Sequence, residues 1–394
     1  MNDSATAERF SLTDKELAAR ANQEATFLVT KLLPKARVSR NKRFLELGSI
    51  GGEEGQSLKI NLTGHVGWWT DFSAAEGSRE YSGDIWKLVA IVRYGGVNRD
   101  ALANAAKWIK STLGLDNLDP NRVLAVRREI QERQRKIDAE AEAERESRAR
   151  SAWFLWSKAV RLPGTPAESY LIGRGIDFRK LGKTPGSLRY RPDVWCMERS
   201  SRENPIKFPA MVAGIVRYDP DQAKTVHVAT HRTYLNIDGW DHATRSGPVS
   251  VVKIRDRRGR EKSHKHTLGQ YAGGHVPVWK GEHDCTLWDI PEGTAVYVSE
   301  GIEDGASLAM AFPERRIVAA VAIANMGGMH FPPQIGPVVF IGQNDPTDSK
   351  AVDAFERAIE RQQDAGRQVE TLFPPAGYKD FNDLLMGKRQ AGPE

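Results

Sequence analysis

Two short apolar runs near the C-terminal end of the chain each stop at polar, mostly acidic residues. Residues 294–299 lead into Glu300, and residues 338–341 lead into a segment that holds Gln343 and Asp345. Short β-branched runs that change into a helical pattern at a glycine are typical of parallel strands joined by crossover helices. Ligands of open parallel sheets bind beyond the carboxyl ends of the strands. We therefore expect Glu300 and Asp345 to meet at one solvent-facing edge of a parallel sheet.

A further predicted strand, residues 369–373, precedes the segment Lys-Asp-Phe-Asn-Asp-Leu at 379–384. If this strand belongs to the same sheet, Asp380 and Asp383 lie at the same edge as Glu300. Several carboxylates completed by water are typical ligands of Mg²⁺ or Mn²⁺. Helix capping by Asp380 is the alternative role, and it is compatible with metal binding.

The N-terminal part of the chain has the pattern of a small α+β unit. Alternating apolar residues at 58–62 predict a strand, and the following segment with Trp68 and Trp69 predicts its partner. Helical patterns flank these strands, with Asp84 as the N-terminal cap of one helix. Successive side chains of a strand face opposite sides, so we expect one tryptophan to be buried and the other exposed. Trp69 is our candidate for stacking on a base, and the alternative is that both tryptophans belong to the core.

Residues 120–160 predict one long helix. Arginine and lysine alternate with glutamate through much of it, so many oppositely charged pairs lie four residues apart. Its N-terminal half has few apolar positions, which predicts a solvated linker. After Ala152 the pattern changes, and an apolar face begins that we expect to dock on the next domain. That face consists of Trp153, Phe154, Trp156, Ala159 and Val160.

The middle of the chain combines predicted strands with many cations. Residues 226–235 form the clearest strand, and His231 and Arg232 must point to its opposite faces. We expect Arg232 to face the acidic edge, because a guanidinium binds phosphate in a bidentate manner. A surface salt bridge is the alternative role for Arg232.

The segment 253–268 is the best candidate for contact with a nucleic-acid backbone, because cations on a loop bind phosphates in a salt-dependent way. A merely solvated loop is the alternative. The candidate residues in it are Lys253, Arg255, Arg257, Arg258, Lys262 and Lys265.

The composition limits the classes of protein to which this chain can belong. The 394 residues carry a net charge of +6, which favours polyanionic partners. The two cysteines, Cys196 and Cys285, exclude a disulfide framework and a four-cysteine zinc site, and we expect no zinc. The N-terminus lacks a signal-peptide core, and no apolar run is long enough to span a membrane. We expect a cytoplasmic protein with no membrane partner.

At these motifs the chain resembles a known family. The strand ending in Glu-Gly, the later strand followed by an Asp-x-Asp-like element and the Lys-Asp-Phe-Asn-Asp-Leu segment resemble the Toprim domain of primases, topoisomerases and some nucleases. The string Gly-Thr-Pro-Ala-Glu-x-Tyr-Leu-x-x-Arg-Gly-Ile at 164–176 is similar to the region before Toprim in phage, plasmid and mobile-element DNA primases. One position departs from the family pattern: Gln343 stands where the first Asp is usual, so one metal position should be weaker.

The resemblance implies a four-part architecture. Residues 1–115 would be an α+β domain similar to the zinc-binding domain of primases but without its cysteines. Residues 116–160 would be the charged linker helix. Residues 161–293 would be a mixed α+β basic subdomain. Residues 294–394 would be an α/β Toprim domain with a Rossmann-like parallel sheet.

The resemblance also implies an activity. A primase joins nucleoside triphosphates into short primers on single-stranded DNA, with two metal ions held by Glu300, Asp345 and Asp380 or Asp383. Glu300 would ligate metal or act as general base, and Glu303, one helical turn later, would support it at the catalytic centre. A separate replicative helicase is an implied partner. The alternatives are a Toprim nuclease, with water as nucleophile, and a catalytically degenerate module that binds DNA or loads a replisome.

Overall fold

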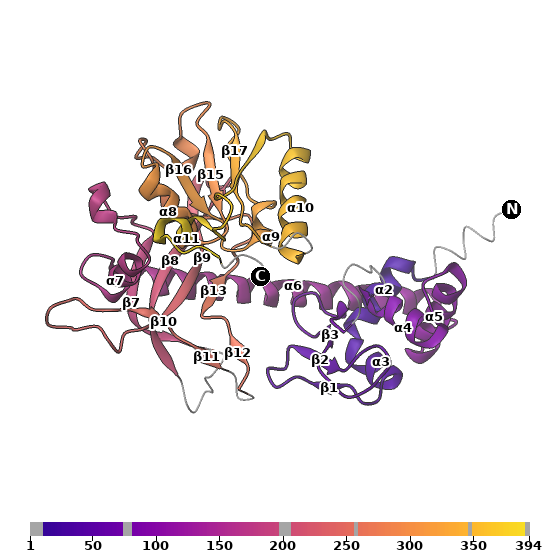
Figure 1. Cartoon of the computed structure of the whole chain (residues 1–394). Coiled ribbons are helices and arrows are strands. Elements are labelled where there is room, and N and C mark those ends of the chain that lie inside the picture. The colour runs from indigo at the N-terminus through magenta and orange to yellow at the C-terminus, as the bar shows by residue number, and fades with distance from the viewer. Residues whose placement is uncertain (1–10, 74–80, 197–205, 256–258, 346–348, 391–394) are drawn as a thin grey trace. The chain divides into compact units, whose positions relative to one another are not determined.

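The computed structural model describes residues 11–73, 81–196, 206–255, 259–345 and 349–390. The chain divides into two compact units, Met1–Glu144 and Arg145–Glu394. Both units mix helices and strands, as the sequence pattern predicts (Figure 1). Helix α6 (Pro120–Ser157) begins in the first unit and ends in the second.

The first unit is built on an antiparallel sheet with the strand order β1-β2-β3-β4-β5. Its strands are β1 (Arg37–Val38), β2 (Phe44–Leu47), β3 (Leu58–Asn61), β4 (Trp69–Asp71) and β5 (Ser82–Gly83). Its helices before α6 are α2 (Asp14–Gln23), α3 (Ala25–Leu32), α4 (Ile85–Tyr94) and α5 (Arg99–Thr112). Leu17, Leu28, Ile60 and Leu88 are fully buried between these helices and the sheet, so the unit has a core of its own.

The tandem tryptophans separate as strand geometry predicts, but Trp69 is not available to a base. Trp69 is 0 % exposed and its indole N–H donates to the carbonyl of Asp84 at 2.8 Å. Trp68 is 48 % exposed. The prediction that Trp69 stacks on nucleic acid is therefore wrong, because its side of β4 faces the core.

The start of α6 is less solvated than its charge pattern predicts. Val123, Val126 and Ile130 are buried in a small cluster with Leu12. The side chain of Gln23 also donates to the carbonyl of Ile130. Three apolar residues at helical spacing are enough to attach the first turns of α6 to the first unit.

The middle part of the chain forms an antiparallel sheet with the order β10-β9-β8-β7-β6, to which β13 adds by pairing with β9. The strands are β6 (Val160–Arg161), β7 (Leu188–Trp195), β8 (Lys207–Asp219), β9 (Lys224–Asn236), β10 (Ser250–Val251) and β13 (Lys265–Gly269). A small hairpin of β11 (Ile254–Arg255) and β12 (Glu261–Lys262) stands apart from this sheet. Helix α7 (Pro166–Gly173) and the 3₁₀ helix η2 (Phe178–Leu181) precede β7.

The last part of the chain is a parallel sheet with one antiparallel edge strand, in the order β14-β16-β15-β17-β18. The strands are β14 (Val276–Trp279), β15 (Val296–Ser299), β16 (Arg316–Ala319), β17 (Val338–Ile341) and β18 (Val369–Leu372). The helices are η3 (Leu287–Asp289), α8 (Ile302–Ala311), α9 (Ile323–Met326), α10 (Lys350–Asp364) and α11 (Phe381–Met386). The predicted parallel strands are thus confirmed, and their carboxyl ends share one edge.

Gly342 follows β17 at a place where a larger residue would not fit. A Cβ atom added there would collide with the ring of Phe373, which follows β18. The close approach keeps the segment with Gln343 against the neighbouring strand.

Within the described ranges, no helix combines the length and the apolarity that a membrane crossing requires.

The neighbouring residues Trp68 and Trp69 provide a matched test of this core. Trp69→Ala should lower the free energy of unfolding by about 3–5 kcal/mol, because it removes a large buried side chain and leaves a cavity. Trp68→Ala should change it by no more than about 0.5 kcal/mol. Calorimetric unfolding of the full chain would measure both, and equal effects of the two substitutions would contradict the observed burial.

Candidate active site

Glu300, Gln343 and Asp345 line one cavity of about 250 Å³ at the carboxyl ends of neighbouring parallel strands. Glu300 follows β15, and the other two residues follow β17. Apolar residues of the flanking helices, such as Met326 and Phe355, complete the walls. The structure thus brings together the residues that the sequence pattern places at this edge.

Glu300 is a half-buried carboxylate whose charge is poorly compensated. Burial raises its pKa above the ordinary value of glutamate, and the nearby charge of Asp345 raises it further. The backbone N–H of Ile323 and the ammonium groups of Lys265 and Lys379 act in the opposite direction. Lys379 Nζ lies 3.9 Å from Asp345 Oδ1. A cation bound between Glu300 and Asp345 would remove the remaining repulsion.

Glu303 is engaged by two partners and holds a lysine beside this edge. Its Oε1 accepts a hydrogen bond from the hydroxyl of Tyr170 on α7, and its Oε2 accepts one from Lys265 Nζ on β13, both at 2.8 Å. Burial opposes ionisation, yet Lys265 and Tyr170 lower the pKa of Glu303 to about 2. Because both oxygens are occupied, this geometry favours Glu303 as the residue that positions Lys265.

Asp304 is a member of the acidic group that our reading of the sequence missed. It is 4 % exposed, and its Oδ1 accepts a hydrogen bond from the backbone N–H of Phe381 at 2.8 Å. Its Oδ2 is buried without a hydrogen-bond partner among the described residues. Burial raises the pKa of Asp304 to about 7, and the charge of Asp380 adds to the effect. Its position four residues after Glu300, one turn along α8, was the available signal.

Asp380 has the capping role that we considered as the alternative. It is the N-cap of α11, and its Oδ1 accepts a hydrogen bond from the backbone N–H of Asp383 at 2.7 Å. Among the described residues, no three or more histidine, cysteine, aspartate or glutamate side chains are grouped closely enough to hold a metal ion. Glu300, Asp345, Asp380 and Asp383 therefore do not form such a group in this structure, although the capping role of Asp380 does not itself exclude metal binding.

His231, rather than Arg232, faces the acidic edge. His231 Nδ1 lies 3.2 Å from Thr267 Oγ1 on β13, and burial followed by the charge of Lys265 lowers its pKa to about 4. Arg232 is 8 % exposed and points to the other face, with Nη1 3.5 Å from the carbonyl of Trp195. Our choice of Arg232 was wrong because strand alternation does not tell which face of β9 lies toward Lys265 and Glu303.

The other predicted cations are spread over different surroundings. Lys253 and Arg255 are exposed near the β11–β12 hairpin, and Lys262 is partly buried within it. Lys265 is half-buried in its ion pair with Glu303. Arg257 and Arg258 lie outside the described residues.

Two asparagines without a predicted role fix the loops around the cavity. The side chain of Asn325 accepts a hydrogen bond from the N–H of Gly273 and donates to the carbonyls of Gly274 and Ala320. The side chain of Asn344 donates to the carbonyls of Pro374 and Tyr378. These bonds hold the loop before Lys379 against the segment that carries Asp345.

Comparison with known proteins finds matches to two domain families and to several solved structures. Residues 295–391 match the Toprim domain, and residues 146–277 match a domain of unknown function (DUF7146). No curated protein matches the chain.

Three solved structures are similar at low identity. The primase fragment of the bacteriophage T7 primase-helicase protein is 14 % identical over 56 % of this chain and 70 % of its own, with a TM-score of 0.31. The DnaG primase catalytic domain bound to ssDNA is 14 % identical over 63 % of this chain and 76 % of its own, with a TM-score of 0.38. The E. coli primase catalytic core is 13 % identical over 57 % of this chain and 70 % of its own, with a TM-score of 0.32.

The match to the Toprim domain agrees with the geometry of the last part of the chain. The matched residues include β15, β17, α11 and the cavity that Glu300 and Asp345 line. The C-terminal part of this chain, residues 295–391, is therefore a Toprim domain.

Proposed function

We propose that the protein is a primase-type nucleotidyltransferase that makes short primers on single-stranded DNA. The observation that carries the proposal is the cavity at the carboxyl ends of β15 and β17, lined by Glu300, Gln343 and Asp345 within a Toprim domain. The basic middle part of the chain supplies cations for a nucleic-acid partner. Nucleoside triphosphates and a template strand are the substrates in this proposal, and a separate replicative helicase is its implied partner.

The donor set of the cavity fits one hard cation better than two. Glu300 and Asp345 offer carboxylate oxygens, and Gln343 offers a neutral amide oxygen, which together suit one Mg²⁺ or Mn²⁺ completed by water. The raised pKa of Glu300 is consistent with this fit, because neighbouring carboxylates gain most from a bound cation. When bound, such an ion lowers the pKa of an attacking hydroxyl and stabilises negative charge on phosphate oxygens.

The chain's own residues then have separate tasks. In primer extension the 3′-hydroxyl oxygen forms a bond to the α-phosphorus, the bond to pyrophosphate breaks, and the hydroxyl proton is lost. Lys265, fixed by Glu303 and Tyr170, is the cation placed to bind nucleotide phosphates. Glu300 either holds the metal ion or accepts the proton. His231 is neutral at pH 7, so it can donate or accept a hydrogen bond but supplies no charge.

One observation favours a second function. Gln343 lowers the negative charge of the cavity, and the described residues contain no three-carboxylate group that would compensate for it. Since ligand charge sets the affinity for divalent cations, a chain with weak metal binding would be a DNA-binding module without catalysis.

Primer synthesis on single-stranded DNA separates these functions. With Mg²⁺ or Mn²⁺ and labelled nucleotides, we expect short products from the wild type and a loss on the order of 100-fold or more in Glu300→Ala. Glu292→Ala is the matched control, because Glu292 is exposed before the amino end of the same strand. Salt-sensitive DNA binding without products in the wild type would instead establish the binding module.

Gln343→Asp tests whether charge limits metal binding. The substitution adds one carboxylate to the cavity, and we expect Mn²⁺ to bind on the order of tenfold more tightly or better. Calorimetric titration of the wild type and the variant with Mn²⁺ would measure the change. An unchanged or weaker affinity would show that the cavity is not the metal site.

The acidic edge should also reduce stability at neutral pH when no metal is present. Asp304 keeps its proton up to a pKa of about 7 in the folded chain, against an ordinary value of 3.8. Between these values the unfolded chain has lost the proton and the folded chain retains it, so stability falls as pH rises from about 4 to 7. Asp304→Asn should remove this dependence and stabilise the protein at pH 8 by on the order of 2–4 kcal/mol.

Urea unfolding in EDTA across this pH range would measure the effect. The wild type and Asp304→Asn should converge below pH 4, where Asp304 is protonated in both states. A difference that stays constant with pH would contradict the raised pKa.

A further inference from the structure

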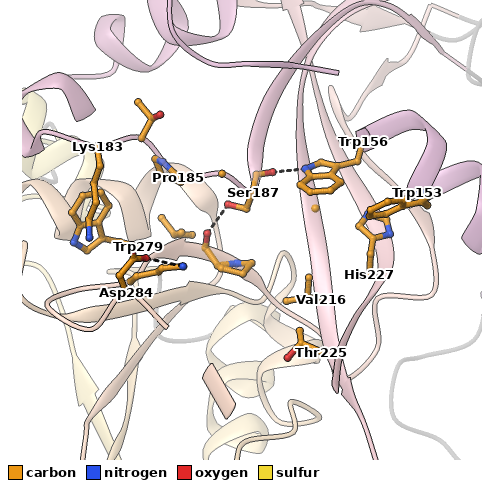
Figure 2. A pocket seen from close by; sticks show the side chains of 16 residues that line it. Trp153, Trp156, Lys183, Pro185, Ser187, Val216, Thr225, His227, Trp279 and Asp284 are labelled. Carbon is orange, nitrogen blue, oxygen red and sulfur yellow. Dashed lines mark hydrogen bonds and ion pairs between the residues drawn. The ribbon is translucent and has the colours of Figure 1, made fainter. Parts of the chain in front are cut away.

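A second and larger cavity lies in the same unit, away from the acidic edge. It has a volume of about 620 Å³, within the range of small-molecule sites. The end of α6, the loop 183–187, β8, β9 and β14 line it (Figure 2). Most of these elements belong to the domain of unknown function matched at residues 146–277.

Sheet register separates the two cavities. Trp279, in the wall of the larger cavity, pairs with Ile317 near the amino end of β16. Glu300 lies beyond the carboxyl end of β15, which runs parallel to β16 as its neighbour. The larger cavity is therefore near the opposite edge of the sheet, and the proposed catalysis does not use it.

One end of the larger cavity is aromatic and is held rigidly. Trp156 donates its indole N–H to the carbonyl of Ser187 at 2.8 Å, and the guanidinium of Arg189 lies 3.8 Å from the ring centroid. The ring of His227 stacks near the same indole, with centroids 5.6 Å apart. These contacts fix Trp156 as a wall of the cavity.

Trp153 supplies the accessible aromatic surface at this end. It is 50 % exposed, and its ring lies edge-on to His227 with centroids 5.5 Å apart. Of the apolar face predicted to dock on the next domain, Trp156 and Ala159 pack against it, whereas Trp153 stays half-exposed and borders the cavity (Figure 2). A half-exposed indole beside a cavity can stack on a flat ligand.

His227 adds a flat and uncharged ring. The hydroxyl of Thr230 donates to the carbonyl of Ala152, so the ring nitrogen Nε2 at 3.0 Å must donate to that hydroxyl oxygen. Burial also lowers the pKa of His227 to about 4. A neutral ring beside two indoles favours an aromatic group at this end over a phosphate.

The other end of the cavity is cationic. Lys183 Nζ lies 5.1 Å above the centroid of Trp279, and Lys280 Nζ lies 2.7 Å from Asp284 Oδ1. Two ammonium groups share one carboxylate at this end, which leaves a net positive charge. Figure 2 shows Lys183, Trp279 and Asp284 across the cavity from Trp153 and His227.

We propose that this cavity binds a nucleobase together with its phosphate. The base stacks on Trp153, and the phosphate is bound by Lys183 and Lys280. The aromatic-to-cationic order of the walls matches the base-to-phosphate order of a nucleotide. A free nucleotide and a base within a single strand share this chemistry, and the experiment distinguishes them.

Binding without divalent metal tests the proposal independently of catalysis. In EDTA, the affinity for a labelled short oligodeoxyadenylate would be measured by anisotropy, and that for dAMP by calorimetry. Trp153→Ala should weaken binding on the order of 5- to 100-fold, as expected for the loss of one stacked base. Trp153→Phe should retain most of the affinity. Lys183→Glu should weaken binding and flatten its salt dependence.

Matched controls lie at the end of α6 and directly after it. Phe154 is also exposed, at 58 %, but does not line the cavity, so Phe154→Ala should leave affinity unchanged. Lys158, which follows the helix, does not line the cavity either, so Lys158→Glu is the control for Lys183→Glu. An abasic oligonucleotide should bind wild type and Trp153→Ala equally, because it has no base to stack.

The pattern of losses identifies the source of the ligand. A Trp153-dependent affinity for dAMP supports a free nucleotide, and the same dependence for the oligonucleotide alone supports a single strand. Equal affinity of wild type and Trp153→Ala for both probes overturns the proposal. One further result would overturn the proposal. An acidic peptide that contains phenylalanine would bind in a Trp153-dependent way, while the affinities for dAMP and for the oligonucleotide would not depend on Trp153.

Discussion

Burial of carboxyl groups at one edge of the parallel sheet is the constraint on which the rest of the second unit depends. Burial raises the pKa of both Glu300 and Asp304, and the charge of Asp345 adds to the effect on Glu300. The fold tolerates this because cations and amides surround the edge. Asn325 and Asn344 secure the loops beside this edge through hydrogen bonds to backbone groups. Such an arrangement is expected where a cation completes the structure, and it is costly where none does.

The trio of Tyr170, Glu303 and Lys265 shows how the two family segments of this unit cooperate. Lys265 and Tyr170 come from the middle part, on β13 and α7, and Glu303 comes from the Toprim helix α8. The carboxylate of Glu303 holds Lys265 in one position. In the proposed function, this restraint means that less conformational entropy is lost when Lys265 binds a phosphate.

Features that depend on local periodicity, such as strands and their ends, were predictable from the sequence. Features that depend on how distant segments pack together were not. The parallel strands and the residues that follow them were predictable, because apolar runs and glycines mark strand ends. Capping of α11 and metal binding were two compatible roles for Asp380, and a single sequence does not show which carboxylates the fold brings together. Alternation placed His231 and Arg232 on opposite faces of β9 but did not say which face lies toward Lys265 and Glu303. Trp68 and Trp69 posed the same problem. The cavity beside Trp153 gave no signal, because loops and strands far apart in the chain form it.

Strand β14 has a consequence for how the chain can be divided. The match to the domain of unknown function ends at residue 277, inside β14, and the Toprim match begins at residue 295. Yet β14 pairs with β16 of the Toprim sheet, and Val216 on β8 exchanges two backbone hydrogen bonds with His275 just before β14. A fragment starting at residue 295 would therefore lack β14 and expose the unpaired backbone groups of the apolar strand β16. Exposed edge strands of this kind promote aggregation. The boundary drawn by sequence families runs through a continuous hydrogen-bonded structure, and the smallest independently folding piece must include both sides of it.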